Sequence, residues 1–313
     1  MNKRENVLSL IDPGEKPAYI PAAFFLHFDP LYHRGQAAVD QHLKYFHSTG
    51  MDFVKIQYEH TFPFLPEIER PEDWSKVPVY PPSFFADPLA VVEGIVKAVK
   101  KDALVVMTLY SPFMIAGQVA GAPTVTRHIQ EDSQRVKPGL ATITESLMNF
   151  VQGCIERGVD GFYHSTQGGE TGRFSDRALF EECVKPYDLT LMEEINRRCI
   201  FNILHVCDYH AGYTDLTAFL DYPGHVVNAS LHLGEKNLTT TEVARLFGRP
   251  YMGGLDRKGV LATGNPDEIR QAVIAVLEAA PERFILAADC TVPSETAWEN
   301  LRTAIDTAHH YLR

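Results

Sequence analysis

Eight short apolar stretches recur along the chain, and each is rich in β-branched or aromatic residues. They lie at 22–28, 53–59, 103–110, 161–167, 201–207, 226–232, 250–255 and 283–290. Apolar runs of this length, bounded by polar or turn-forming residues, are typical of strands that are buried on both faces of a sheet. The pattern therefore predicts eight strands.

Between these stretches the apolar residues change to the spacing of one helix face. In 87–101 the stripe consists of Leu89, Val92, Val96 and Val99. Asp87 is a suitable N-cap there, with Pro88 at the first helical position, and Asn265 and Pro266 repeat the device in 265–280. Further helices are predicted at 139–156, 176–197 and 295–311, and less regular patterns at 37–48, 212–220 and 239–247.

Strands that alternate with helices predict a parallel sheet, most simply a (β/α)8 TIM barrel formed by one domain over 1–313, with 1–20 as an N-terminal extension. The connections from helix into strand are short. Two connections from strand into helix, 60–86 and 111–139, are long and contain several prolines. In such barrels the loops that follow the strands form the active face, so we expect a site at the carboxyl ends of the strands.

Charge and cysteine content narrow the possible functions. The 313 residues carry a net charge of −11, which speaks against binding to nucleic acid. No apolar stretch reaches the roughly 20 residues of a membrane-spanning helix, and the start of the chain lacks the apolar core of a secretion signal. Five scattered cysteines are an odd number, which favours free thiols or metal ligands in a reducing cytoplasm over disulfides.

Polar residues finish most of the predicted strands. They are His27, Glu59, Tyr110, His164, Gln167, Glu170, His205, Cys207, Asn228, His232, Asp256, Asp289 and Cys290. His205 and Cys207 are alternate residues of one strand, so their side chains share a face. Cys290 ends another strand at the same rim. One imidazole and two thiolates are a ligand set of catalytic zinc, which keeps its fourth position open.

Other interpretations of these residues stay open. A lone His-x-Cys is more often part of a core than a metal site, and His232 is equally compatible with a structural role. Cys154, Cys183 and Cys199 fall in predicted helices, where cysteine commonly acts as a small buried apolar residue.

Three segments of the second half resemble the uroporphyrinogen decarboxylase superfamily. They are "ILHVCD" at 203–208, "GGLDRKGVLATGNPDEIRQAV" at 253–273 and "FILAADCTVPSETAWENLRTAID" at 284–306. The middle segment is similar to the family's G-x-hydrophobic-D…L…G-(T/N)-P-E-E-(I/V) stretch, and "TAWENL" to its T-P-x-E-N ending. The resemblance spans about 150–312 and implies a (β/α)8 barrel.

Two branches of that superfamily are compatible with the resemblance. Its methyltransferases pass a methyl group between a corrinoid (cobalamin) protein and a thiol, using zinc on His-x-Cys plus a later Cys, a pattern that falls on His205, Cys207 and Cys290. The decarboxylase of tetrapyrrole biosynthesis instead opens with an arginine-rich segment, whereas 24–35 here contains only Arg34. Its catalytic aspartate aligns with Glu59, and its late histidine is replaced by "AADC" at 287–290.

The resemblance therefore favours a zinc-dependent methyltransferase that uses a corrinoid. Glu59 is the predicted catalytic residue and the first candidate for an exchangeable fourth ligand. The predicted substrate-binding residues are His27, Tyr110, Gln167, Glu170 and Asn228. The expected partners are a small methyl donor or thiol acceptor and a corrinoid protein, and the family implies a possible homodimer.

Two alternatives remain at this point. The first is decarboxylation of a pyrrole or another acid, with Glu59 as the acid–base group. The second is a barrel without turnover, in which zinc is closed by a fourth protein ligand chosen from Asp289, His164 and Glu170.

Overall fold

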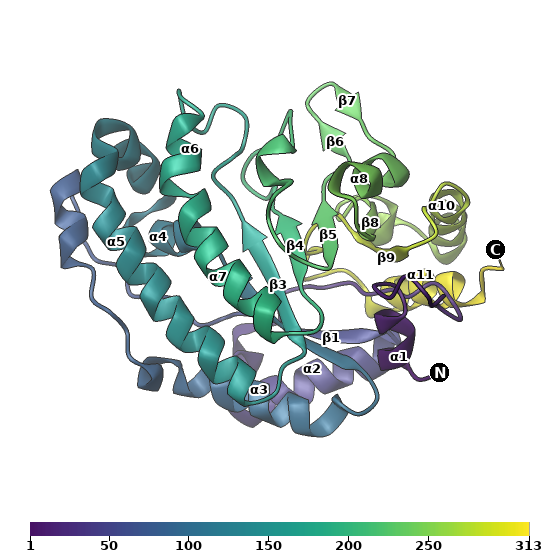
Figure 1. Cartoon of the computed structure of the whole chain (residues 1–313). Helices are drawn as coiled ribbons and strands as arrows, with labels where there is room; N and C mark the ends of the chain where they lie inside the picture. The colour runs from purple at the N-terminus through teal and green to yellow at the C-terminus, as the bar shows by residue number, and fades with distance from the viewer. Residues whose placement is uncertain (313) are drawn as a thin grey trace.

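A computed structural model of the chain describes residues 1–312, and its centre is a curled sheet of seven parallel strands (Figure 1). The strands follow each other in the order β1-β2-β3-β4-β5-β8-β9. They are β1 Phe53–Ile56, β2 Leu104–Tyr110, β3 Gly161–Thr166, β4 Ile203–Val206, β5 Val226–Ala229, β8 Tyr251–Leu255 and β9 Phe284–Ala288. Seven of the eight predicted strands are thus confirmed, and their order along the sheet is their order along the chain.

The predicted strand at 22–28 differs, because only its start pairs with the sheet. Ala22 forms a single parallel bridge with Leu286 of β9, and the Ala23 amide donates to the Leu286 carbonyl (3.0 Å). On the other side, the Asp52 amide donates to the Ala22 carbonyl (3.0 Å), just before β1. The segment therefore lies between the two edges of the curled sheet without forming a regular ladder.

One buried carboxylate fixes this junction. Asp52 accepts hydrogen bonds from the Ala22 amide and the Tyr19 hydroxyl, each at 2.7 Å. It also lies 2.8 Å from Nε2 of His309 in the last helix. The beginning of the chain, the first strand and the C-terminal helix thus meet at a single side chain.

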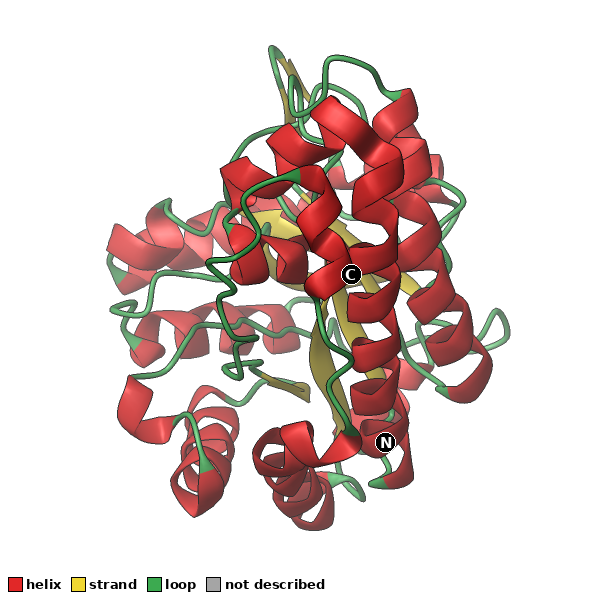
Figure 2. Ribbon diagram, turned by 90° about the vertical axis from the view of Figure 1, so that its left-hand side faces the viewer, coloured by secondary structure: helices red, strands yellow, loops and turns green. Residues whose placement is uncertain are grey.

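The helices surround the strands, as Figure 2 shows by the red ribbons outside the yellow sheet. They are α1 Lys3–Leu8, α2 Gly35–Thr49, α3 Ala86–Val99, α4 Pro112–Ala120, α5 Ala122–Glu156, α6 Ala178–Cys183, α7 Lys185–Arg198, α8 Thr240–Phe247, α9 Val260–Thr263, α10 Pro266–Glu278 and α11 Trp298–His310. Asn265 caps α10 as predicted, through the Asp267 and Glu268 amides. Helix α3 begins one residue before the predicted cap, so Asp87 lies in its first turn.

The prediction of a long loop over 111–139 was wrong. Ser111 caps α4 by accepting from the Met114 amide, and Pro112 occupies the first helical position. Helix α5 then continues to Glu156, with a break from helical geometry at Asp132 and with Pro138 inside it. Proline is tolerated in a first helical turn, and Pro112 and Pro123 lie at the starts of α4 and α5, whereas Pro138 lies inside α5.

The other connections contain short elements. Residues 60–86 hold two 3₁₀ helices, Pro71–Lys76 and Pro82–Phe85, and the pattern at 212–220 yields only the 3₁₀ helix Thr217–Phe219. A small antiparallel hairpin, β6 His232–Leu233 and β7 Lys236–Asn237, follows β5. Among residues 1–312, no helix is both long and apolar enough to cross a membrane.

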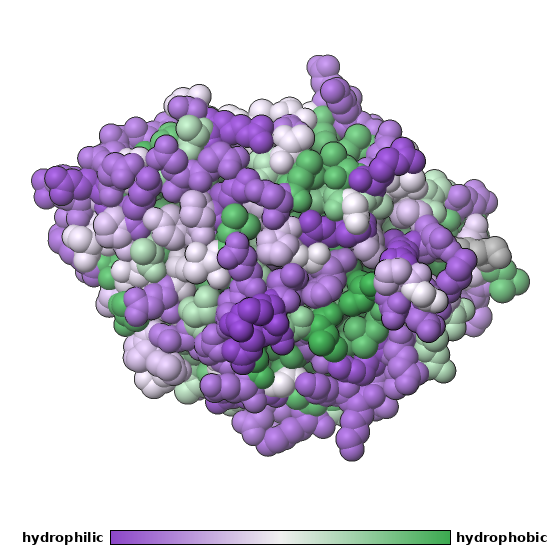
Figure 3. Space-filling view, viewed as in Figure 1, coloured by the Kyte–Doolittle hydropathy of each residue, from purple (hydrophilic) through white to green (hydrophobic). Residues whose placement is uncertain are grey.

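Aromatic side chains fill one end of the space enclosed by the sheet. Phe53 makes edge contacts with Phe25 and Phe201 at ring-centre distances of 5.7 and 5.8 Å, and Phe25 contacts Tyr163 at 5.7 Å. Phe53 begins β1 and Phe201 lies just before β4, so these rings fill the interior near the amino ends of the strands. The outer face in Figure 3 is mainly hydrophilic, as expected when the apolar residues are in the core.

Candidate metal centre

The carboxyl ends of two separate strands, β4 and β9, bring the predicted ligands together. His205 lies in β4 beside Ser165 of β3 and Asn228 of β5. Cys207 directly follows β4, and its amide extends the ladder by donating to the Thr166 carbonyl (3.0 Å). Cys290 comes two residues after the end of β9. The extended backbone at 205–207 points both side chains to the interior, as the alternation of a strand requires.

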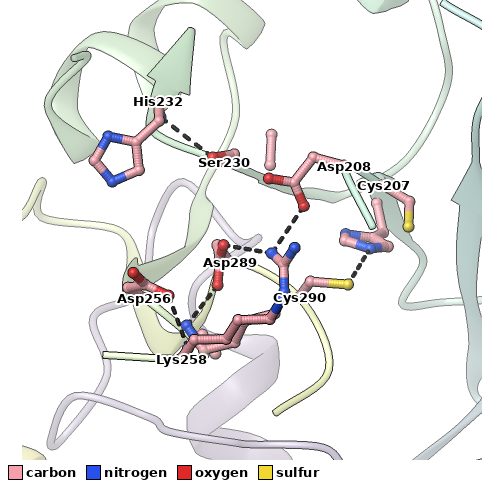
Figure 4. Close-up of polar contacts among 12 residues, drawn as sticks. Cys207, Asp208, Ser230, His232, Asp256, Lys258, Asp289 and Cys290 are labelled. Atoms are coloured by element: carbon pink, nitrogen blue, oxygen red, sulfur yellow. Dashed lines mark hydrogen bonds and ion pairs between the residues drawn. The ribbon is translucent and has the colours of Figure 1, made fainter. Parts of the chain in front are cut away.

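The three donor groups form one compact, buried cluster. The ligand atoms of His205, Cys207 and Cys290 all lie within 4.8 Å of one another, and Nε2 of His205 is 3.4 Å from Sγ of Cys290 (Figure 4). In tetrahedral zinc sites, bond lengths of about 2.0 Å to nitrogen and 2.3 Å to sulfur put neighbouring donors about 3.5–3.8 Å apart. The cluster therefore fits a zinc ion without large movement.

The surroundings favour a thiolate. The hydrogen bond from Cys290 and the adjacent His205 imidazole lower the pKa of the Cys207 thiol well below its usual value, despite burial. Cys290 retains the proton of this pair, so its pKa is raised. The Gln167 amide also donates to Sγ of Cys207 (3.4 Å). A site with one thiolate already stabilised needs to lose only one further proton to bind a divalent cation.

The imidazole of His205 is held by packing. Its ring lies against the Tyr163 ring, with a centre-to-centre distance of 4.9 Å, and its Nδ1 is buried. Within the described chain this Nδ1 has no hydrogen-bond partner, so only Nε2 takes part in the polar cluster. A neutral imidazole with Nε2 aimed at two sulfurs is the form that ligates a metal.

A cavity of about 400 Å³ opens beside the cluster, and all three ligand side chains line it. Helix α4 forms one wall, through residues that include Phe113 and Gln118. The segment predicted to be a loop over the site is therefore a helix that shapes it.

The predicted substrate-binding residues separate into two groups. His27, Tyr110 and Gln167 line the cavity. Glu170 instead accepts hydrogen bonds from Arg173 and the Gly168 amide, and it is not among the described residues of the cavity wall. Asn228 is fully buried and bonded to Tyr163 and to the carbonyls of Met252 and Ala288.

Glu59, the predicted catalytic residue, lies behind the cavity wall. Its Oε1 is 2.8 Å from Nδ1 of His27 and 3.9 Å from Nε2 of His33. Because His27 lines the cavity, Glu59 is placed to act through that imidazole. Its catalytic role stays a prediction.

None of the three candidates for a fourth protein ligand is placed at the cluster. Asp289 is bonded to Arg257, and Glu170 to Arg173. His164 neighbours Ser165 along β3, and Ser165 lines the cavity, so His164 points to the opposite face and toward Asp188 (3.9 Å). Within the described residues only His205, Cys207 and Cys290 form such a group.

Two other predicted strand-end residues also lie elsewhere. His232 belongs to the hairpin, where its Nδ1 is 2.6 Å from the Asn237 side chain. Asp256 accepts from the Lys258 amide on the surface. Figure 4 shows both away from the two cysteines.

Two basic residues were missed by the sequence reasoning. Lys55, in β1, lines the cavity and donates to Gln57 Oε1 (2.8 Å) and Thr108 Oγ1 (3.2 Å). Burial lowers its pKa to about 7. Arg257, after β8, bonds both Asp208 and Asp289. A lysine inside the apolar run "FVKIQ" is a visible signal, whereas nothing in the sequence links Arg257 to two distant aspartates.

Comparisons with known proteins agree with this architecture. The family model for uroporphyrinogen decarboxylase (URO-D) matches residues 46–311, well beyond the 150–312 covered by the sequence resemblance, and the chain therefore belongs to this family. A search of curated proteins found no match.

Two solved structures share the fold. A methyltransferase from Methanosarcina mazei superposes with a TM-score of 0.80 at 15% identity, with 98% of each chain covered. A B12-independent methionine synthase from Shewanella sp. W3-18-1, in complex with selenomethionine, gives 0.53 at 11% identity, covering 93% of this chain and 97% of the other. At these identities the similarity concerns the fold.

Proposed function

We propose that this protein is a zinc-dependent methyltransferase that moves a methyl group between a corrinoid carrier and a thiol or methylated small molecule. One observation carries the proposal: the donor atoms of His205, Cys207 and Cys290 converge within 4.8 Å beside a cavity. The proposal also includes a closed barrel, in which residues 22–28 are the eighth strand. Their hydrogen bonds to both edges of the sheet support this.

The three side chains would hold zinc and leave one position toward the cavity. Zinc, when bound there, lowers the pKa of a coordinated thiol and so provides a thiolate nucleophile at neutral pH. Gln167 keeps its hydrogen bond to Cys207 and so moderates the charge on that sulfur. Tyr163 keeps the imidazole plane fixed by ring contact.

The charge of the site explains the position of Lys55. Zinc with two thiolates and a neutral imidazole is formally neutral, so a substrate thiolate gives the centre a charge of −1. Lys55 lines the same cavity, and its amine donates to Gln57 and Thr108, which are both uncharged. Because neither partner neutralises it, a positive charge on this amine stabilises the negative charge that arises when the substrate loses its proton.

The cavity lacks features expected of a site for a tetrapyrrole with many carboxylates. Among the described residues of its wall, Lys55 and Arg173 are the lysine and the arginine, and Arg173 is already bonded to Glu170. The family match and the carboxylate of Glu59 still make decarboxylation the second candidate. Incubation with uroporphyrinogen tests it: formation of coproporphyrinogen supports a decarboxylase, and its absence counts against decarboxylation of this substrate.

A zinc site closed by four protein ligands is disfavoured by the arrangement. Asp289 and Glu170 are engaged with arginines, and His164 faces away from the cavity. The open position beside the cavity is typical of catalytic zinc.

The proposal extends to location and partners. All five cysteines are free thiols, which fits a reducing compartment such as the cytoplasm. A corrinoid protein would deliver the methyl group at the carboxyl ends of the strands, where the cavity opens. A homodimer is proposed on family grounds alone.

Elemental analysis of the purified protein, followed by an assay with methylcobalamin and a small thiol, tests the function. We expect about one zinc per chain, loss of methyl transfer after chelation, and recovery when zinc is restored. X-ray absorption is expected to show two sulfurs, one nitrogen and one displaceable light atom. Full activity in metal-free protein would refute the proposal.

A further inference from the structure

Arg257 connects the two separate strand ends that carry the cysteines. Its Nη1 donates to Oδ1 of Asp208 (2.8 Å) and to Oδ2 of Asp289 (2.6 Å), as the dashed lines in Figure 4 show. Asp208 directly follows Cys207, and Asp289 directly precedes Cys290. One guanidinium thus holds the chain next to each thiol.

Further hydrogen bonds hold Arg257 and Asp289 in place. The Arg257 amide also donates to Oδ1 of Asp289 (2.8 Å), and the Asp289 amide donates to the carbonyl of Leu255, the last residue of β8 (2.9 Å). The side chains of Arg257, Asp208 and Asp289 are only 11%, 13% and 14% exposed. A charged network with so little exposure is rigid, because its members cannot exchange their partners for water.

Sheet order shows why such a connection is needed. The strand β4, which carries His205 and precedes Cys207, is separated from β9 by β5 and β8. His205 and Cys207 are placed by the same strand, but the sulfur of Cys290 comes from three positions around the sheet. Asp208 and Asp289 would also repel each other if no cation stood between them.

We infer that Arg257 is a positioning residue of the metal centre: by bridging Asp208 and Asp289 it sets the spacing of Cys207 and Cys290. The inference rests on the zinc site proposed above. Arg257 itself is not a ligand, and its effect passes through the two backbones that carry the thiols. Partners of metal ligands commonly change metal affinity about 10–100-fold when they are removed.

The test measures Co²⁺ binding by the full-length protein in competition with a chelator, together with the thiolate-to-cobalt charge-transfer absorption in the near ultraviolet. For R257M we expect a 10–100-fold weaker affinity and a weaker charge-transfer band, because one sulfur no longer reaches the ion at its normal distance. R257K, which keeps the charge but bonds fewer oxygens at once, is expected to recover part of both.

Arg249 provides the matched control. It lies before β8, at the opposite end of the strand from Arg257, and bonds the carbonyls of Gly224 and Tyr222. R249M is expected to lower the melting temperature of the metal-free protein while leaving the cobalt affinity and spectrum unchanged. This separates a loss of general stability from a loss of ligand spacing.

The outcomes distinguish the two claims. Unchanged cobalt affinity and spectrum in R257M, beside a wild type that binds cobalt through two thiolates, overturn the role of Arg257 alone. A wild type that shows no thiolate-to-cobalt absorption overturns the metal centre and this inference with it. If R257M does not fold, D208N replaces it, since it removes one arm of the bridge and is expected to weaken cobalt binding in the same direction.

Discussion

Two buried histidines on neighbouring strands have opposite surroundings. His205 of β4 faces the interior, with Nε2 next to a thiol and a cavity beside it. His164 of β3 is completely buried on the other face of the sheet, where both ring nitrogens lack a hydrogen-bond partner among the described residues. Burial lowers the pKa of His164 to about 3.

This comparison shows that burial of an imidazole does not by itself indicate a functional site. His164 is 3.9 Å from Asp188, whose pKa burial raises to about 7, so at pH 6 the two face each other as neutral groups. That arrangement carries a stability cost, because both groups are buried without their charged forms. His205 is equally buried, but soft donors and open space surround it, and these two features together indicate a site.

The strongest test of this contrast removes each ring in turn. H205A is expected to weaken zinc binding on the order of 10²–10³-fold, because about 10–16 kcal/mol of binding is shared among four ligands. H164A is expected to leave zinc affinity unchanged. Isothermal titration or chelator competition measures both, and equal losses in the two variants would erase the distinction drawn here.

The pH dependence of the free energy of unfolding tests the pair formed by His164 and Asp188. Asp188 keeps its proton in the folded state up to about pH 7, so it reduces stability as pH rises from about 4 to 7. His164 stays neutral in the folded state, so it reduces stability as pH falls from about 6.5 to 3. Between pH 4 and 6.5 the two slopes oppose each other.

D188N removes the contribution of Asp188 to the pH dependence of stability. We expect the variant to match the wild type near pH 4 and to exceed it by a few kcal/mol at pH 7, as a shift of about three pKa units implies. Urea denaturation at a series of pH values measures this difference. H164A is expected to give the complementary result, with a gain over the wild type that grows as pH falls; a difference that does not vary with pH would contradict the pairing.

A substitution of Lys55 tests the cavity next to His205. K55M is expected to keep its zinc and to lose about 10- to 100-fold in methyl transfer, since a charge-assisted contact is worth roughly 1.5–3 kcal/mol. The rate is also expected to require a higher pH, because the substrate thiolate loses a nearby cation. Metal analysis and a pH–rate profile measure these effects. A normal profile in K55M would show that the lysine serves the structure only.

The smallest effect is expected for Glu59. This carboxylate contacts the cavity residue His27 rather than the cavity itself, and glutamine keeps an oxygen that can accept a hydrogen bond there. E59Q is therefore expected to lower the rate only a few-fold, which corresponds to about 1 kcal/mol. Steady-state kinetics decide the matter. A loss as large as that of H205A would instead make Glu59 a directly catalytic group.

The fold could be predicted from the sequence wherever the pattern is local. Buried parallel strands give continuous apolar runs, and the N-cap Asn265 with Pro266 at the first helical position indicates the start of α10. The prediction was wrong at 111–139, because Ser111, Pro112 and Pro123 begin helices there and had been interpreted as loop residues. The segment 22–28 is apolar enough for a strand, yet its partners are the two edges of the sheet, which only the complete fold reveals.

The candidate site could be predicted in its ligands and less well in its surroundings. Alternation along β4 is a local rule, and it places His205 and Cys207 together. Glu170 and Asn228 were assigned to the substrate because they follow or end strands, but their partners Arg173 and Tyr163 take them out of the cavity wall. Lys55 is visible as a lysine inside an apolar run, whereas Arg257 bonds two aspartates that are 49 and 32 positions away, which no periodicity encodes.

The junction at Asp52 and Ala22 has a consequence for biosynthesis. Ala22 pairs with Leu286, and Asp52 with His309, which lies 257 positions later in the sequence, so the partners of this junction are synthesised at very different times. Contacts of such long range slow folding. Cys290 also follows His205 and Cys207 at a distance in the sequence, so a nascent chain offers only two of its three soft donors until residue 290 has been synthesised.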